Sequence, residues 1–172
     1  MRIKGMAAAM GLNIKKLAAA SLFAALIFVV TGFLAVRIPN TTGYLHPGDT
    51  VIYAAAYLVG EPLAAASAAV GAVLADIAAG AVVYVPATAV IKGAMALLAS
   101  ALIKRGGARA YVLASLAGGA VMTLGYAVYE LALFGAAYAL TGLPFNCLQS
   151  LVSAALSAAV FGAVRRLKNI LE

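Results

Sequence analysis

Long apolar runs separated by short polar segments set the pattern of this chain. The first run, Leu17–Val36, holds 20 residues without a charged side chain, and about 20 apolar residues are enough for one helix to cross a bilayer. Later runs repeat the pattern at Thr50–Gly60, Pro62–Gly80, Pro86–Ile103, Ala110–Leu140 and Cys147–Val164. The pattern therefore predicts an all-α integral membrane protein with six transmembrane helices.

The second of these helices is too short to cross a bilayer alone. Residues Thr50–Gly60 number 11 and cover about 16 Å of a hydrocarbon core that is about 30 Å thick. The loop before them, Arg37–Asp49, carries two prolines, two glycines and the only histidine. We expect this long extracellular loop to descend to membrane depth, where irregular backbone must be buried in protein or line a polar cavity. The loop therefore indicates a binding site, and Asp49 is placed to cap the short helix.

Turn-forming residues predict where the other helices end. The run Ala110–Leu140 is longer than a span needs, so we expect its helix to tilt or to kink near Gly125 or Gly135. The remaining connections are expected at Gly60–Pro62, Gly80–Pro86, Lys104–Arg109 and Thr141–Asn146.

Composition excludes the soluble classes of protein. Hydrophobic residues make up 66% of the 172 residues and charged residues only 10%, and the mean hydropathy is +1.08. These residues cannot build the polar surface of a soluble enzyme or a nucleic-acid-binding domain. The length fits one domain, residues 1–172, in a cell membrane.

The basic residues predict the orientation. Lysine and arginine number 12 and give a net charge of +7, but they lie at helix ends and not along one face, which argues against nucleic-acid binding. With six spans, Arg37 is the only basic residue outside the spans that lies on one side of the membrane. Ten basic residues share the other side: Arg2, Lys4, Lys15, Lys16, Lys104, Arg105, Arg109, Arg165, Arg166 and Lys168. The positive-inside rule then places both termini in the cytoplasm and the Arg37–Asp49 loop outside.

Motifs for catalysis are missing. One histidine and one cysteine, on different predicted elements, do not make a convincing nucleophilic pair. The chain has no Walker A phosphate loop, serine elbow or HExxH zinc motif. We therefore expect a protein that is not an enzyme, holds no cofactor or metal ion, and cannot hydrolyse ATP itself.

Four polar side chains interrupt the apolar spans and are candidates for function, because ionisable groups are costly inside a membrane. Asp76 and Lys92 flank the Gly80–Pro86 loop and are placed to meet as an ion pair, which either locks two helices together or also contacts a ligand. Glu130 has no basic partner on its own helix, so a ligand contact and a structural hydrogen bond both stay open. Gln149 lies at the outer end of the last helix.

Aromatic, histidine and amide side chains near the same loops complete the candidate site. Each has a structural alternative, because tyrosines also pack between helices, histidines stabilise turns and asparagines cap helices. These further candidates are Tyr44, His46, Tyr53, Tyr84, Tyr126 and Asn146. On the first helix, the spacing of Ala20 and Ala24 predicts either close packing within the chain or a smooth face for a membrane partner.

Two segments resemble the substrate-binding S components of energy-coupling factor (ECF) vitamin transporters. Gly43–Asp49 reads GYLHPGD and matches the GY(I/L)xxGD motif that follows the first helix in family members. Ala75–Gly93 reads ADIAAGAVVYVPATAVIKG and looks like the family segment AD…G…Y.P.T..IKG. The AxxxA motif through which the family contacts its coupling subunit maps on Ala20 and Ala24.

This resemblance, which covers nearly the whole chain, implies a chain that only binds substrate. The substrate would be a water-soluble vitamin or precursor, taken from outside, while a transmembrane coupling subunit and two ATPase subunits supply the energy for import. The tyrosines, Glu130 and Asn146 favour a small aromatic ring with hydroxyl or amino groups, such as pyridoxine or hydroxymethylpyrimidine. Riboflavin and pantothenate are the alternative ligands.

Other classes of membrane protein compete with this interpretation. A stand-alone proton-coupled secondary transporter would use Asp76 and Glu130 as proton sites, but 172 residues leave little room for two gates and no inverted repeat is evident. A membrane enzyme of lipid metabolism lacks its catalytic residues, and a purely structural membrane protein is the third alternative.

Overall fold

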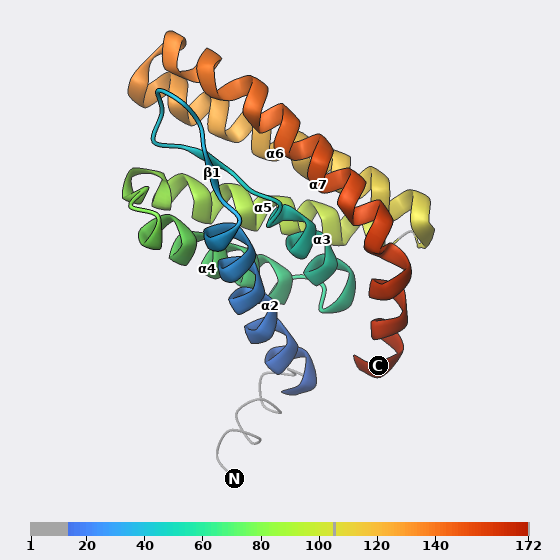
Figure 1. Ribbon diagram of the computed structural model, residues 1–172. Coiled ribbons are helices and arrows are strands. Elements are labelled where there is room, and N and C mark those ends of the chain that lie inside the picture. Colours follow the sequence, from blue (N-terminus) through green and yellow to red (C-terminus); the bar gives the residue numbers. More distant parts are fainter. Residues whose placement is uncertain (1–13, 105, 172) are drawn as a thin grey trace.

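The computed structural model describes residues 14–104 and 106–171, and the chain within them is almost entirely helical (Figure 1). The elements are α2 (Ile14–Phe33), β1 (Val36–Arg37), β2 (Tyr44–Leu45), α3 (Asp49–Leu58), α4 (Leu63–Ala78), the 3-10 turn η1 (Val82–Tyr84), α5 (Val85–Ile103), α6 (Gly107–Phe134) and α7 (Ala136–Leu171). The expected all-α fold class is therefore confirmed.

The helices differ in how well they can span a membrane. Four segments of the described chain have the length and composition for it: Ile14–Phe33, Val82–Ile103, Gly107–Phe134 and Ala136–Lys168. Helix α4 is apolar but has 16 residues, and α3 has only 10. The expected short second helix is thus present, and four of the six expected spans have full length.

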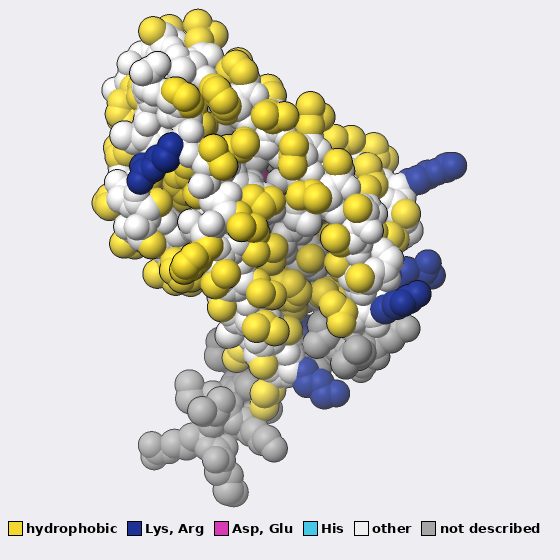
Figure 2. Space-filling model, viewed as in Figure 1, with side chains coloured by type: hydrophobic (Ala, Val, Ile, Leu, Met, Phe, Trp, Pro, Cys, Tyr) yellow, Lys and Arg dark blue, Asp and Glu magenta, His cyan; other side chains and the backbone are white. Residues whose placement is uncertain are grey.

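Apolar side chains cover much of the surface. Figure 2 shows yellow side chains over most of the visible face, with lysines and arginines projecting at its edges. Large hydrophobic residues on several helices are exposed, including Leu22, Val90 and Val128 at 61%, 71% and 66%. A soluble protein rarely leaves apolar surface of this extent in water, whereas a bilayer covers it.

Glycines allow the helices of the interior to approach closely. A Cβ atom on Gly71 of α4 would lie 2.4 Å from the carbonyl oxygen of Ala24 in α2. On α6, a Cβ atom at Gly118 would lie 2.7 Å from the Tyr53 ring of α3. These contacts fix α2 against α4 and α3 against α6, in the way that small residues pack membrane helices. They leave α3 enclosed in the bundle with most of its residues buried.

The boundary between the last two helices differs from the prediction. The expected loop Thr141–Asn146 is helical and lies inside α7, including Pro144. The chain turns instead at Gly135, one of the two expected kink positions, where φ is +85° and ψ is 174°. Only glycine adopts this backbone conformation readily. A proline is tolerated within a membrane helix because neighbouring groups satisfy the freed backbone, so turn chemistry at 141–146 did not end the helix.

The long loop, residues 34–48, lies over one end of the bundle. Its strands β1 and β2 pair antiparallel, with Val36 opposite Leu45. The Arg37 guanidinium donates to the carbonyl oxygen of Ala79, just after α4, at 2.8 Å. In Figure 1 the loop lies at the same end as the α6–α7 turn, far from the start of α2 and the end of α7. The described chain therefore begins and ends on the side of the molecule that lies away from the long loop.

Candidate functional site

A pocket opens between the long loop and helices α4 to α7. Its space, mouth included, is about 390 Å³. The lining residues are Ile38, Gly43, Tyr44, His46, Asp76, Tyr84, Thr88, Tyr126, Glu130, Asn146 and Gln149. Residues that lie between positions 38 and 149 thus converge on one polar, aromatic cavity inside an otherwise apolar bundle.

The long loop is held over this pocket by hydrogen bonds to two helices, α4 and α7. The Tyr44 hydroxyl donates to Oδ1 of Asp76 in α4 at 2.6 Å. The His46 amide donates to Oε1 of Gln149 in α7 at 3.0 Å. The Thr42 amide donates to the hydroxyl of Tyr138, also in α7, at 2.8 Å. Because these contacts join distant parts of the chain, the loop acts as the roof of the pocket.

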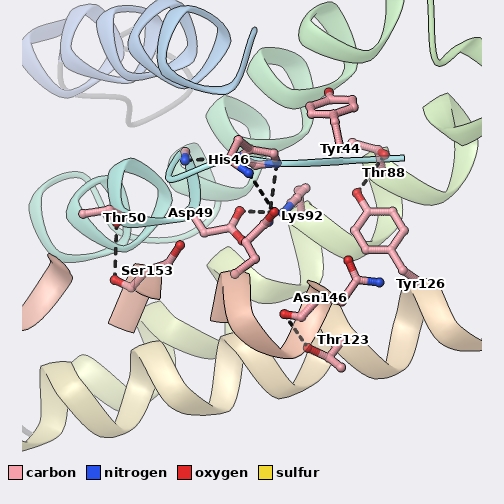
Figure 3. Close-up of polar contacts among 12 residues, drawn as sticks. Tyr44, His46, Asp49, Thr50, Thr88, Lys92, Thr123, Tyr126, Asn146 and Ser153 are labelled. Atoms are coloured by element: carbon pink, nitrogen blue, oxygen red, sulfur yellow. Dashed lines mark hydrogen bonds and ion pairs between the residues drawn. The ribbon is translucent and has the colours of Figure 1, made fainter. Parts of the chain in front are cut away.

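A buried ion pair supports the floor beneath the loop (Figure 3). Lys92 Nζ on α5 lies 2.5 Å from Oδ1 of Asp49, and each side chain is only 1% exposed. The second carboxylate oxygen of Asp49 accepts the side-chain amide of Gln149 at 2.8 Å. This arrangement corrects two predictions. Lys92 pairs with Asp49 and not with Asp76, and helix α3 is capped at Gly48 without a side-chain bond, because the Asp49 carboxylate turns to Lys92.

His46 is a neutral imidazole in this arrangement. Burial, helped by the nearby Lys92 ammonium, lowers the pKa of His46 to about 4. Its Nδ1 accepts the Gly48 amide at 3.1 Å, so the proton of the neutral ring lies on Nε2. The side-chain amide nitrogen of Gln149 is 3.4 Å from Nε2, but it already donates to Asp49 and cannot accept that proton. His46 therefore keeps one N–H that a ligand in the pocket can use.

Tyrosines form the opposite wall of the pocket. Tyr84 and Tyr126 meet edge to face with ring centroids 5.9 Å apart, and the Tyr126 hydroxyl lies 2.9 Å from the hydroxyl of Thr88. The Tyr84 hydroxyl donates to Oε1 of Glu130 at 2.8 Å. Such a wall offers aromatic faces for stacking beside polar groups that orient a ring.

The sequence carries a family signature over nearly its whole length. Residues 11–166 match the family model described as ECF-type riboflavin transporter, S component. The chain belongs to this family. No curated protein matches the chain. The family makes this S component the substrate-binding part of a vitamin transporter, a multi-pass membrane protein that works with an energy-coupling module and its ATPases and is not itself an enzyme.

Most residues proposed from the sequence meet at the pocket of the S component. Eight of the ten line it: Tyr44, His46, Asp76, Tyr84, Tyr126, Glu130, Asn146 and Gln149. Lys92 lies behind this layer, where it positions Asp49 and through it Gln149. Tyr53 is fully buried in the helix core against Gly118. The structure therefore gives both of these side chains places outside the pocket wall.

Sequence reasoning missed three lining residues, Ile38, Gly43 and Thr88. Thr88 had a usable signal, because it precedes Lys92 by one helical turn and so shares its face of the helix. Ile38 and Gly43 had none beyond their place in the long loop, since neither carries a polar side chain. Asp49 was also missed as the partner of Lys92, because its position before a helix favoured a capping role.

The two alanines of the first helix lie against α4. Ala20 is 6% exposed, and its carbonyl oxygen accepts the Ser67 hydroxyl at 2.7 Å. Ala24 is half-buried, with its carbonyl oxygen beside Gly71. Within the described chain, the AxxxA motif of the S component thus makes contacts of its own with α4.

Proposed function

We propose that this S component captures a small aromatic vitamin or precursor from outside the cell, with pyridoxine or hydroxymethylpyrimidine as the preferred ligand. The observation that carries the proposal is the pocket itself. Aromatic faces of Tyr84 and Tyr126 lie beside the Glu130 carboxylate and the free N–H of His46. A ring with short polar substituents can stack on the tyrosines and bond both kinds of group.

The small size of the pocket supports a single ring. The space of about 390 Å³ includes the open mouth, so the part that the protein encloses is smaller still. Riboflavin, with three fused rings and a sugar-alcohol chain, needs considerably more space. It is nevertheless the second candidate, because the family description names it.

The placement of charge supports uptake from outside. Arg37 lies in the long loop, whereas Lys104, Arg109 and Arg165 lie near the ends of helices on the other side of the bundle. By the positive-inside rule this other side faces the cytoplasm. The loop-covered pocket then opens outward, and the ATPases act from the cytoplasm.

Equilibrium binding to the purified protein tests the proposal. The chain has eight tyrosines and no tryptophan, so titrations followed by tyrosine fluorescence and by calorimetry report on the pocket. We expect tight binding of pyridoxine or hydroxymethylpyrimidine without ATP and weaker binding of riboflavin. Tight binding of riboflavin alone would replace the preferred ligand by the second candidate.

Transport assays test whether this chain only binds the ligand while its partner subunits drive import. Proteoliposomes that hold this chain alone should not accumulate the ligand, and those that also hold the coupling subunit and ATPases should do so when ATP is supplied. Concentrative uptake by the chain alone, driven by a proton gradient, would contradict the proposal and favour a secondary transporter.

A further inference from the structure

Two carboxylates of the pocket each have an oxygen without a partner. Asp76 and Glu130 both line the pocket and are 5% and 4% exposed. Tyr44 donates to one oxygen of Asp76 and Tyr84 to one oxygen of Glu130. Oδ2 of Asp76 and Oε2 of Glu130 are buried without a hydrogen-bond partner. A buried carboxylate oxygen without a donor is energetically unfavourable, so these two oxygens indicate donors that come from a ligand.

The described residues do not supply the missing positive charge. Among them, no lysine or arginine lines the pocket, and Arg37 is exposed and bonded to a backbone carbonyl. His46 is neutral. Lys92 is the buried cation of this region, but its Nζ is 2.5 Å from Asp49. Three buried carboxyl groups, those of Asp49, Asp76 and Glu130, thus lie in and beside the pocket with one buried ammonium.

Neighbouring neutral groups do not satisfy the two oxygens either. The Thr88 hydroxyl lies close to both the Asp76 carboxyl and the Tyr126 hydroxyl, yet Oδ2 of Asp76 has no hydrogen-bond partner within bonding distance. Gly142 of α7 lies against Glu130, where a Cβ atom would come within 2.7 Å of Oε2, and it offers no side-chain donor. The two carboxylates are therefore fixed by packing and remain available to a bound molecule.

We propose that the pocket selects a positively charged nitrogen compound, an aromatic ring with an ammonium or protonated ring nitrogen that donates to Asp76 and Glu130. This inference rests on the proposed function and specifies the ligand class further. Charge-assisted hydrogen bonds to buried carboxylates are stronger than neutral ones, and the same field disfavours anions. A ligand with a carboxylate, such as pantothenate, is thereby excluded.

A matched series of ligands tests this selection. Pyridoxamine, pyridoxine and pyridoxic acid share one ring and differ in an aminomethyl, hydroxymethyl or carboxylate substituent. We expect the purified protein to bind pyridoxamine at least 10-fold more tightly than pyridoxine, and pyridoxic acid not measurably. Equal affinities for the amine and the alcohol would overturn the inference while the proposed single-ring function stands. If no single-ring compound binds, the proposed function fails and the inference fails with it.

Substitutions show whether the two carboxylates cause the preference. Glu130→Gln and Asp76→Asn keep the shape of each side chain but remove its charge, so each should reduce the pyridoxamine preference at least threefold. Glu61→Gln is the matched control, because Glu61 pairs with Lys104 away from the pocket, and its preference should equal that of the unchanged protein. Thr88→Val, a neutral change in the pocket wall, should weaken both ligands alike. A preference that survives both carboxylate substitutions would overturn the inference.

Discussion

At the scale of single residues, Gly142 leaves the space that the Glu130 carboxylate occupies. Gly142 lies in the second turn of α7, and inside a helix glycine is unfavourable by about 1 kcal/mol relative to alanine. An added methyl group would lie 2.7 Å from Oε2 of Glu130, closer than such atoms approach. The glycine therefore makes room for the carboxylate at some cost to helix stability.

Gly142→Ala should displace the Glu130 carboxylate and weaken ligand binding about 10-fold, which is about 1.4 kcal/mol. Calorimetric titration measures the effect. Gly162→Ala is the matched control, because Gly162 lies in the same helix and a Cβ atom there meets nothing within 4 Å. Native affinity in Gly142→Ala would show that the position of Glu130 is not critical.

His46, in the roof of the pocket, makes the stability of the protein depend on pH. The folded pKa is about 4 and the ordinary value is 6.5, so the unfolded chain binds more protons between these values. The stabilisation by neutral His46 is complete above pH 6.5 and is lost as the pH falls toward 4. The free energy of unfolding should decrease by up to about 3 kcal/mol over this range.

Denaturant unfolding in detergent at several pH values measures this loss. His46→Asn is the control, because its side-chain oxygen can still accept the Gly48 amide but does not titrate between pH 4 and pH 7. The variant should lose less stability than the unchanged protein as the pH falls. Parallel pH profiles for the two proteins would contradict the role assigned to His46.

At the scale of the helices, α2 combines internal packing with the proposed contact surface for the coupling subunit. The family implies such a subunit, and the AxxxA motif is the proposed contact. Ala20 and Ala24 lie against α4, whereas the neighbouring Ala25 is exposed. A bulky side chain at Ala20 or at Ala25 distinguishes packing against α4 from contact with the coupling subunit.

Ala20→Trp should lower the midpoint of thermal unfolding of the isolated chain by several degrees, because the indole cannot fit beside Ser67. Ala25→Trp should leave unfolding and ligand binding unchanged and serves as the exposed control. Co-purification with the coupling subunit measures docking for both. A folded, ligand-binding Ala20→Trp chain that no longer assembles would favour the AxxxA motif as the contact surface.

Helix boundaries also show where sequence reasoning reached its limit. The residues Thr141–Asn146 contain a glycine, a proline and an asparagine, which favour a turn in water, yet they are helical here. Inside a membrane the backbone must keep its hydrogen bonds, so the break occurs at Gly135, where a left-handed conformation is accessible. Hydropathy predicted that helices exist, and local turn chemistry placed this boundary wrongly.

At the scale of the whole molecule, the residues of the pocket were easier to predict from the sequence than the ion pairs among them. Ionisable residues in apolar helices must turn inward, and so Asp76 and Glu130 could be assigned from sequence to one interior region. Which carboxylate meets Lys92 depends on how α3 lies between α5 and α7, and no sequence pattern encodes that distance. The partner of Lys92 therefore became clear only in three dimensions.

The orientation of the molecule in the membrane determines whether the pocket can serve import. We predict that the long loop faces outside and the turn between α5 and α6 faces the cytoplasm, because the basic residues concentrate on the latter side. Single cysteines in a Cys147→Ala background test this, at Thr42 of the loop and at Ala108 in the first turn of α6, both of which are exposed. A membrane-impermeant maleimide should label Thr42→Cys in intact cells and Ala108→Cys only after lysis. The reverse pattern would open the pocket toward the cytoplasm and contradict uptake from outside.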